Sequence, residues 1–357
     1  MINLAQTAAD EGATLLNYTN VRELRRSNGI TSGVVVQDEI GGGEISIAAR
    51  CVINATGPFT DTVRRLDEPE CQPIMKASRG VHVVLDGSFL GGETAIMVPH
   101  TDDGRVLFAI PWLDRVVIGT TDTAVEELDI EPEAHPDEIE FILSHAAKYL
   151  THDPTYADIK SVFAGLRPLV MRDSAENTAE LSREHQILIS ASGLVTITGG
   201  KWTTYRLMAE ETIDQAVTLA GLTYAPSETR NLAIHGWEKN FPVFGALGHY
   251  GVDAYRIEVM IDQDPRLGAF LHEDLPVTAA LVVWSVREEM AQSVEDVLAR
   301  RTRCLLLDAR ASGEIAEDVA KIMAEELGRD KDWVRAQVRE YRELVARYLP
   351  GGTAGQA

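Results

Sequence analysis

One stretch, residues 194–216 (LVTITGGKWTTYRLMAEETIDQA), constrains the fold of this chain more than any other. It begins as an apolar alternating run typical of a strand, turns at Gly199 and Gly200, and continues as a helix. Free N–H groups at a helix start carry the positive end of its dipole, and paired glycines allow a tight turn against a ligand. A threonine-capped helix with an incidental Lys201 accounts for the threonines but leaves the glycines and lysine unexplained. We therefore expect a strand–turn–helix unit that faces a ligand.

Composition excludes several classes of protein. The chain has 357 residues, enough for two or three cores, and a net charge of −22, which argues against nucleic acid as the main partner. An anionic substrate must then be met by a local group of basic residues. Three distant cysteines suggest neither disulfides nor a metal site, and indicate a reducing cytoplasm. Without a long apolar run or a leader pattern, we expect no export and no membrane span, which leaves a peripheral membrane contact open.

The pattern of apolar residues divides the chain into four parts. Residues 1–68 alternate helix and strand, and residues 69–178 contain successive strands that predict a mostly antiparallel sheet, followed by one helix at PDEIEFILSHAAKYL. Residues 179–222 return to the α/β pattern. Residues 232–350 show 3.6-residue periodicity with helix-start signals such as Ser293 and Asp330. The predicted fold is α/β, with an antiparallel-sheet domain and a C-terminal all-α domain.

Two further segments carry candidate binding residues. The strand CVINATG ends in the small residues Ala55, Thr56 and Gly57, which would let the backbone approach a ligand closely, although an ordinary strand–turn–helix joint is the simpler alternative. In FAGLRPLV, Arg167 lies between apolar residues and before Pro168, which holds it extended. A buried guanidinium needs a partner, so a structural salt bridge and a ligand contact are equally good interpretations of Arg167.

Arg183 and His82 are weaker candidates by themselves. Arg183 begins the strand of SREHQILIS, where a solvated edge residue is the simpler interpretation. His82 lies at the centre of the strand GVHVVLD, and most such histidines are structural. A histidine beside a carbon that loses a hydroxyl proton would nevertheless suit a general base, because its pKa lies near neutrality.

Six motifs in order, INATGPFTDTVRRL, SRGVHVVLD, IPWLDRVVIGTTDT, FAGLRPLV, SREHQILIS and TITGGKWTTYR, resemble the FAD-dependent glycerol-3-phosphate dehydrogenases. The resemblance runs from about Leu4 into the C-terminal helices. It implies that residues 1–68 and 179–222 form a partial FAD-binding, Rossmann-like domain, that residues 69–178 form the substrate domain, and that residues 232–350 form the family's C-terminal helical domain.

The resemblance also assigns residues to the cofactor. It implies that Ala55, Thr56 and Gly57 pass beside FAD. It implies that the segment Gly199, Gly200, Lys201, Trp202 and Thr203 faces the pyrimidine edge of the flavin. A helix N-terminus there would stabilise the negative charge that the flavin gains on reduction.

For the substrate, the resemblance implies a pocket lined by Arg167, Arg183 and Lys201, with His82 as a candidate base. Two guanidiniums and an ammonium suit a phosphate monoester dianion. The implied reaction converts sn-glycerol 3-phosphate to dihydroxyacetone phosphate, with electrons passed to a quinone at the membrane. The implied location is the cytoplasm, with peripheral contact at the inner face of the cell membrane, and a homodimer is one open assembly.

The sequence departs from the family at its start. The family opens with a βαβ unit carrying GxGxxG for the FAD pyrophosphate, and this motif is absent from the chain. We therefore expect an N-terminally truncated form that binds FAD poorly alone. Three alternatives stay open: an oxidase that uses oxygen, an amino-acid or sarcosine oxidase on the same fold, and a non-catalytic remnant that serves as a binding module.

Overall fold

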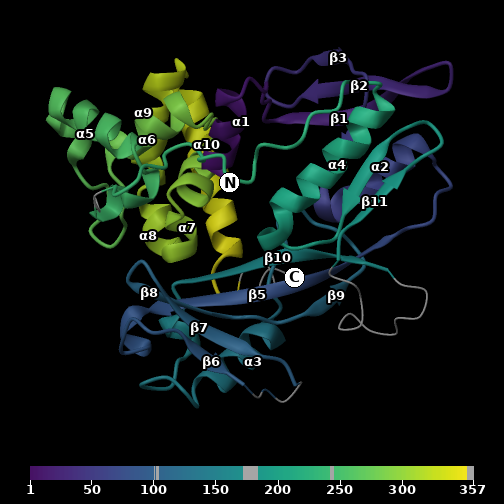
Figure 1. Ribbon diagram of the computed structural model, residues 1–357. Coiled ribbons are helices and arrows are strands. Elements are labelled where there is room, and N and C mark those ends of the chain that lie inside the picture. Colours follow the sequence, from purple (N-terminus) through teal and green to yellow (C-terminus); the bar gives the residue numbers. More distant parts are fainter. Residues whose placement is uncertain (100, 102–103, 172–183, 242–244, 352–357) are drawn as a thin grey trace.

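The computed structural model describes residues 1–99, 101, 104–171, 184–241 and 245–351. Three sheets and a group of C-terminal helices make up the described part of the chain (Figure 1). Helices α2 and α4 lie beside the two smaller sheets, α1 lies beside α10 of the C-terminal helices, and the largest sheet lies below them in the view of Figure 1. The predicted fold class, α/β with an antiparallel-sheet domain and a helical domain, is confirmed. The predicted domain boundary at residues 178/179 lies outside the described residues.

The first part of the chain contributes helix α1 (Ile2–Asp10) and an antiparallel three-stranded sheet. The strands of this sheet are β1 (Thr19–Ser27), β2 (Ile30–Asp38) and β3 (Glu44–Ala48). Tyr18, just before β1, donates a hydrogen bond of 2.8 Å to Asp296 of the helical domain. This contact joins the first sheet to a region almost 280 residues away in the sequence.

A second three-stranded sheet joins two segments that are far apart in the sequence. Its order is β11 (Gln186–Ile189), β12 (Val195–Thr198) and β4 (Ile53–Asn54), with β12 and β4 parallel. The 3-10 turn η1 (Gly57–Phe59) and helix α2 (Thr60–Asp67) follow β4. The 3-10 turn η5 (Trp202–Thr204) and helix α4 (Tyr205–Leu219) follow β12, as the Gly-Gly motif predicted. Both strands therefore direct their carboxyl ends, and the helix that follows each, to the same side of the sheet.

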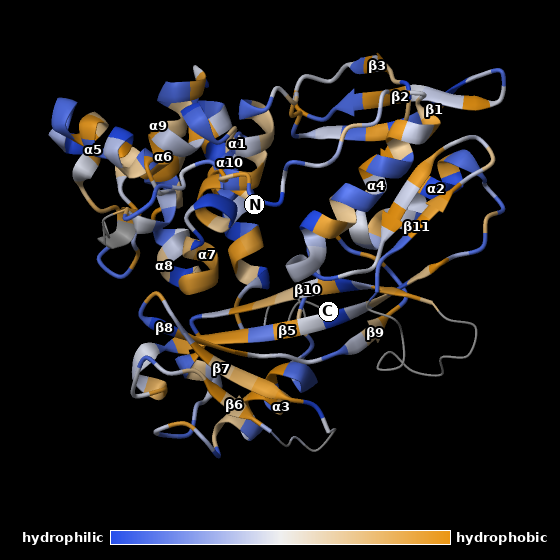
Figure 2. Cartoon of the chain, in the orientation of Figure 1, coloured by the Kyte–Doolittle hydropathy of each residue, from blue (hydrophilic) through white to orange (hydrophobic). Residues whose placement is uncertain are grey.

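The largest sheet has six antiparallel strands in the order β10-β5-β8-β7-β6, with β9 also paired to β5. Its strands are β5 (Met75–Asp86), β6 (Ile96–Val98), β7 (Leu107–Trp112), β8 (Arg115–Gly119), β9 (Thr123–Val125) and β10 (Ser161–Val170). These strands are largely hydrophobic, as Figure 2 shows for β5 and β7. The run of strands without helices in this region thus gave an antiparallel sheet, as predicted.

Helix α3 (Pro136–Ala146) covers one face of this sheet. Ile139, Ile142 and Leu143 of α3 form a buried cluster with alternate apolar residues of β5, including Val81 and Val83. The opposite face carries the other alternate residues, because side chains alternate along a strand. That second face is the one on which the candidate site lies.

The remaining helices form a separate buried core. The longer ones are α5 (Asp253–Gln263), α6 (Ala279–Glu288), α9 (Ala316–Leu327) and α10 (Lys331–Arg347), with the short helices α7 (Cys304–Leu307) and α8 (Ala309–Glu314) between them. The predicted start signals are present: the Asp330 side chain accepts hydrogen bonds at the start of α10, and Ser293 accepts one from Asp296 N. Backbone hydrogen bonds from Val162 N to Tyr348 O and from Ala309 N to Lys160 O join this domain to β10.

Candidate active site

The side chain of Arg167 extends from β10 across the neighbouring strand β5, instead of projecting directly away from the sheet. Gly165 of β10 pairs with Gly80 of β5, and Arg167 pairs with Ser78. The Arg167 guanidinium lies across Gly80, because a Cβ atom placed on Gly80 would fall 2.2 Å from its Nη2. Only a glycine at position 80 leaves room for this path.

Across β5, Arg167 reaches the loop between β8 and β9. Its Nη2 donates to Thr120 Oγ1 at 2.8 Å, and its Nη1 donates to the Thr121 carbonyl at 3.1 Å. Asp122 Oδ1 lies 3.5 Å from the same Nη1. The salt bridge considered for Arg167 is therefore present, and it is combined with two hydrogen bonds that fix the plane of the guanidinium. A half-buried, oriented guanidinium of this kind suits recognition of an anion.

His82 lies on the same face of the sheet, two residues after Gly80 on β5. Its ring covers Gly119 of β8, where a Cβ atom would fall 2.3 Å from the ring, and it stacks on Phe163 of β10 at 5.1 Å between ring centres. Burial, together with the positive charge of Arg167, lowers the pKa of His82 to about 4. The imidazole is consequently neutral near pH 7 and able to accept a proton.

Open backbone lies beside these two side chains, at Gly165 of β10. Gly165 is exposed, and a Cβ atom placed on it would meet nothing within 4 Å. It pairs with Gly80, which the Arg167 guanidinium covers, and it lies two residues from Phe163, on which His82 stacks. We did not single out Gly80, Gly165 or the loop residues 120–122 from the sequence, although a glycine inside each of two apolar strands was the available signal.

The end of β4 forms a second part of the site. Asn54, buried at the sheet edge, donates to the Thr60 carbonyl at 3.0 Å and accepts from Thr56 Oγ1 at 2.7 Å. Ala55 and Thr56 are exposed, and Gly57 has a φ of 56° with open space around its Cβ position. The predicted residues 55–57 thus form a backbone segment that another molecule can approach closely.

The end of β12 forms the third part. Gly199 and Gly200 have φ values of 76° and 74°, a left-handed conformation that favours glycine. Thr204 caps the turn, since Lys201 N donates to its Oγ1 at 3.2 Å. The side chains that follow the turn are exposed, and Trp202, 59% exposed, stacks on Tyr205. The predicted segment therefore presents the start of α4 and an aromatic ring to the surface.

Contacts bring these three parts together. The turn η1, which follows β4, contacts both β5 and β10. A Cβ atom on Gly199 would fall 2.6 Å from Val170 Cγ2, so the end of β12 lies against the end of β10. Thr60 Oγ1 donates to Thr198 Oγ1 at 3.3 Å, which links the start of α2 to the end of β12. Arg183, the remaining predicted substrate residue, lies outside the described residues.

These surfaces fit part of a dinucleotide cofactor. The open backbone at Gly57 and the exposed start of α4 leave room for a planar ring beside the sheet site. The glycine-rich pyrophosphate motif is absent from the sequence, so the residues present fit the ring portion and not the pyrophosphate. Within the described ranges, no three His, Cys, Asp or Glu side chains are arranged to hold a metal ion.

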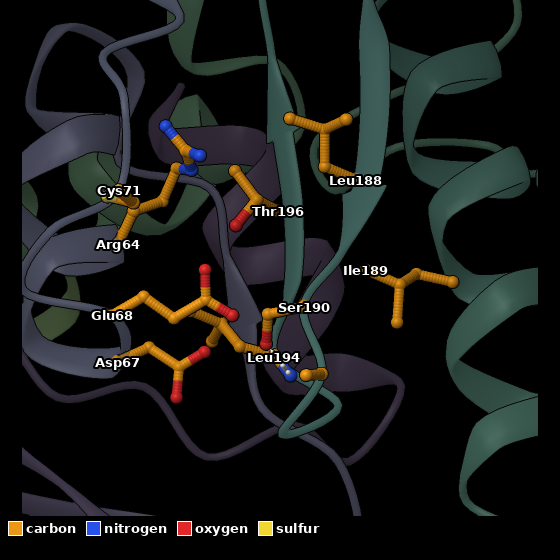
Figure 3. Close-up of a pocket in the computed structure, with 10 residues that line it drawn as sticks. Arg64, Asp67, Glu68, Cys71, Leu188, Ile189, Ser190, Leu194 and Thr196 are labelled. Atoms are coloured by element: carbon orange, nitrogen blue, oxygen red, sulfur yellow. Dashed lines mark hydrogen bonds between the residues drawn. The ribbon is translucent and has the colours of Figure 1, made fainter.

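A separate pocket of about 260 Å³ lies between α2 and the β11–β12 hairpin, at the far end of β12 from Gly199 (Figure 3). Asp67 at the end of α2 and the following Glu68 line one side, and Leu188, Ser190 and Thr196 line the other. Burial opposes ionisation of Asp67, but hydrogen bonds from Ser190, Ser192 and Arg26 lower its pKa. These bonds tie α2 to β1, so we assign Asp67 a structural role outside the candidate site.

No helix among the described residues is both long and apolar enough to span a bilayer. This finding concerns membrane-spanning helices and leaves peripheral contact untested.

Comparison with known families gives two matches along the chain. Residues 1–213 match the family described as FAD dependent oxidoreductase. Residues 227–334 match the family described as C-terminal domain of alpha-glycerophosphate oxidase. The first match contains the whole candidate site, and the second covers most of the helical domain.

Individual relatives agree with these matches. A probable mitochondrial glycerol-3-phosphate dehydrogenase of Caenorhabditis elegans is 37% identical over 95% of this chain and 50% of its own length. The mitochondrial glycerol-3-phosphate dehydrogenase of Rattus norvegicus is 34% identical over 97% of this chain and 51% of its own length. The chain therefore spans about half the length of the curated relatives it matches.

A solved structure supports the same fold. The glycerol-3-phosphate dehydrogenase from Bacillus halodurans, solved in complex with FAD, superposes with a TM-score of 0.84 at 27% identity. The superposition covers 97% of this chain and 72% of the other. The arrangement of the sheets and the helical domain is thus shared along nearly the whole chain.

Proposed function

Because this chain belongs to the FAD-dependent glycerol-3-phosphate dehydrogenase family, we propose that a protein containing it oxidises sn-glycerol 3-phosphate to dihydroxyacetone phosphate. FAD is the cofactor of this family. The observation that carries the proposal is the sheet site: an oriented Arg167 and a neutral His82 on one face of the sheet, beside the open backbone of Gly165.

Recognition of the substrate rests on its phosphate group. Arg167 offers guanidinium N–H groups in a fixed plane, a geometry that matches phosphate oxygens. Arg183 and Lys201 are proposed to complete the cationic group around the phosphate. Such a local group is needed because the chain as a whole carries a charge of −22 and would otherwise repel a dianion.

His82 is proposed as the base. In the oxidation, the C2 hydroxyl loses its proton and the C2–H bond breaks with loss of a hydride, which gives the ketone. Burial and the charge of Arg167 lower the pKa of His82 to about 4, so the ring is neutral near pH 7 and has a nitrogen that can receive the hydroxyl proton. The same low pKa makes it a weaker base than the unperturbed histidine that the sequence suggested. Bound FAD would supply the hydride acceptor.

The cofactor is proposed to lie against residues 55–57 and 199–203. Helix N–H groups at the start of α4, together with Lys201, place positive charge at this position. The exposed Trp202 offers an apolar surface at the same turn. The positive end of α4 would therefore stabilise the negative charge that the cofactor carries after it has accepted electrons.

We propose a quinone as the electron acceptor. Peripheral contact with the inner face of the membrane and assembly as a homodimer are further expectations. The alternative within this class is an oxidase, because the second family match is named for an alpha-glycerophosphate oxidase. Stopped-flow reoxidation of the FAD-loaded protein by a soluble quinone analogue and by oxygen separates the two. Faster reoxidation by oxygen would reject the quinone proposal.

The central test is binding of substrate and cofactor. We expect calorimetry to detect glycerol 3-phosphate with the wild-type protein and to find binding weakened at least tenfold in Arg167→Ala. Arg310→Ala is the matched control, since Arg310 donates to the Ile159 carbonyl in another region. Equal affinity in Arg167→Ala and wild type would contradict the proposed site.

Cofactor binding is tested on the 357-residue chain itself. Flavin absorbance and fluorescence quenching after gel filtration measure how much FAD stays bound. We expect weak binding, because the chain carries no glycine-rich pyrophosphate motif. A stoichiometric yellow protein would overturn that expectation while supporting the assignment of FAD.

A further inference from the structure

The loop that orients Arg167 lies where β5 changes partners. Strand β5 pairs with β8 up to Gly119 and with β9 from Thr123 onward. Residues 120–122 fill the gap between these two strands. Val81 N of β5 donates to Thr121 Oγ1 at 3.0 Å, so a side chain replaces the missing backbone partner at this position.

On the far face of the sheet, a buried carboxylate holds the same loop. Glu138 of α3 is only 8% exposed, and its Oε1 accepts from Thr121 Oγ1 at 2.9 Å and from Thr123 Oγ1 at 2.7 Å. Its Oε2 accepts from His135 N at 3.1 Å and pairs with Arg79 at 2.9 Å. Burial opposes ionisation of Glu138, but these hydrogen bonds and Arg79 lower its pKa.

Thr121 links the two faces. Its hydroxyl donates to Glu138 on one side, and its carbonyl accepts from Arg167 Nη1 at 3.1 Å on the other. Arg79 by itself would neutralise the Glu138 carboxylate. The hydroxyls of Thr121 and Thr123 have an additional effect, because they fix the middle of the loop and the first residue after it relative to α3.

We propose that Glu138 and Thr121 are positioning residues, which set the plane and the position of the Arg167 guanidinium for a phosphate monoester dianion. The inference rests on the proposed function for the identity of the anion, and on the hydrogen-bond chain Glu138–Thr121–Arg167 for the positioning. Glu138 and Thr121 themselves do not touch the anion. They act by preventing the loop from relaxing when Arg167 exchanges contacts with a ligand.

The test uses three variants. Thr121→Val removes the hydroxyl and keeps the shape, Thr121→Ser keeps the hydroxyl, and Thr302→Val is a control. Thr302 is a buried threonine of the helical domain that donates to the Val297 carbonyl at 2.8 Å. The Thr302→Val substitution should lower the free energy of unfolding by a comparable amount without changing any contact in the sheet.

One readout is the titration of His82, followed by NMR of its ring. Because the charge of Arg167 helps to lower the pKa of His82, displacement of Arg167 should raise that pKa above its wild-type value of about 4. We expect such a rise in Thr121→Val and none in Thr121→Ser or Thr302→Val. An unchanged His82 titration in Thr121→Val would overturn the positioning role, whatever ligand the site binds.

The second readout is calorimetric binding of glycerol 3-phosphate, with inorganic phosphate as a smaller probe. We expect Thr121→Val to weaken both about tenfold, Thr121→Ser to stay within about twofold, and Thr302→Val to bind as wild type. If wild type binds neither probe but the His82 titration moves as expected, the proposed function fails while the positioning role stands. If wild type binds both and Thr121→Val binds equally well, the positioning role fails alone.

Discussion

The two halves of the candidate site differ in how the chain supports them. In the sheet half, nine of the twelve residues of β5 are buried, and Arg167 and His82 have partners on several strands. In the half proposed to hold the flavin, formed by residues 55–57 and 199–203 with α4, helix α4 has fifteen residues, of which only Thr212 and Ala216 are buried. The sheet half is therefore organised by the protein itself. The proposed flavin half presents exposed groups, including Trp202, whose order would depend on what binds there.

The largest expected difference between the halves is in stability. Ile118 of β8 is fully buried, whereas Ile213 of α4 is 51% exposed. Ile118→Ala should lower the free energy of unfolding by about 2–5 kcal/mol, because it leaves a cavity in the core. Ile213→Ala should change it by no more than about 0.5 kcal/mol. Urea unfolding of both variants measures the difference, and equal losses would show that α4 has a packed partner.

His82 should also make the stability of the sheet half depend on pH. Its pKa of about 4 in the folded protein lies below the 6.5 of an unperturbed histidine, so between these pH values the unfolded chain binds more protons. The stabilising contribution is complete above pH 6.5 and is lost as pH falls toward 4. The loss is at most about 3 kcal/mol, since each tenfold change in proton affinity corresponds to about 1.4 kcal/mol.

The check is unfolding at several pH values for wild type and His82→Phe. The variant should lose stability less steeply between pH 6.5 and 4. Parallel curves for the two proteins would mean that His82 titrates alike in the folded and unfolded chains.

Gly80→Ala should separate ligand binding from stability in the sheet half. A Cβ atom at position 80 would meet only the flexible end of Arg167, so the guanidinium can move away at little cost to folding. Binding of glycerol 3-phosphate should weaken about tenfold, because the anion loses a pre-oriented partner. Gly92→Ala, with nothing near its Cβ position, is the control. Unchanged binding in Gly80→Ala would show that the path of Arg167 over this glycine is unimportant.

The smallest expected effect is on the surface of α4. Arg206 and Glu210 form a partly exposed ion pair one helical turn apart. Glu210→Gln should cost only about 0.3–0.5 kcal/mol and lose even this at high salt. Thermal unfolding at low and high salt is the measurement. A cost of several kcal/mol would mean that this helix is held more firmly than its exposure indicates.

Much of the fold could be predicted from local patterns. The helix at Pro136–Ala146, the strand ending at Thr198 and the antiparallel region between Met75 and Val170 all follow from alternation, caps and glycine turns, which depend on neighbours in the sequence. The family resemblance was confirmed as well. The roles of the site residues stay predictions, and Arg183 lies outside the described residues.

Other features could not be predicted, because they depend on pairing between distant strands. Nothing near Arg167 in the sequence indicates that its guanidinium crosses Gly80, which is 87 residues away, to reach Thr120. Nor does the helix containing Glu138 indicate that this carboxylate holds the loop behind Arg167. The register of β10 on β5 sets the first contact, since a shift of one residue would turn Arg167 to the opposite face. The packing of α3 against the sheet sets the second.

Residue type and local spacing are enough to predict the order of strands and helices, the Gly-Gly turn before α4 and the set of cationic and imidazole side chains. How those side chains are held depends on long-range strand pairing. Pairing β10 with β5 put Gly165 opposite Gly80, and pairing β12 with β4 put residues 199–203 on the same side of the second sheet as residues 55–57. These arrangements are stabilised by the burial of apolar side chains and by pairing between distant strands. Neither can be read from a short stretch of sequence, because both involve residues that are far apart along the chain.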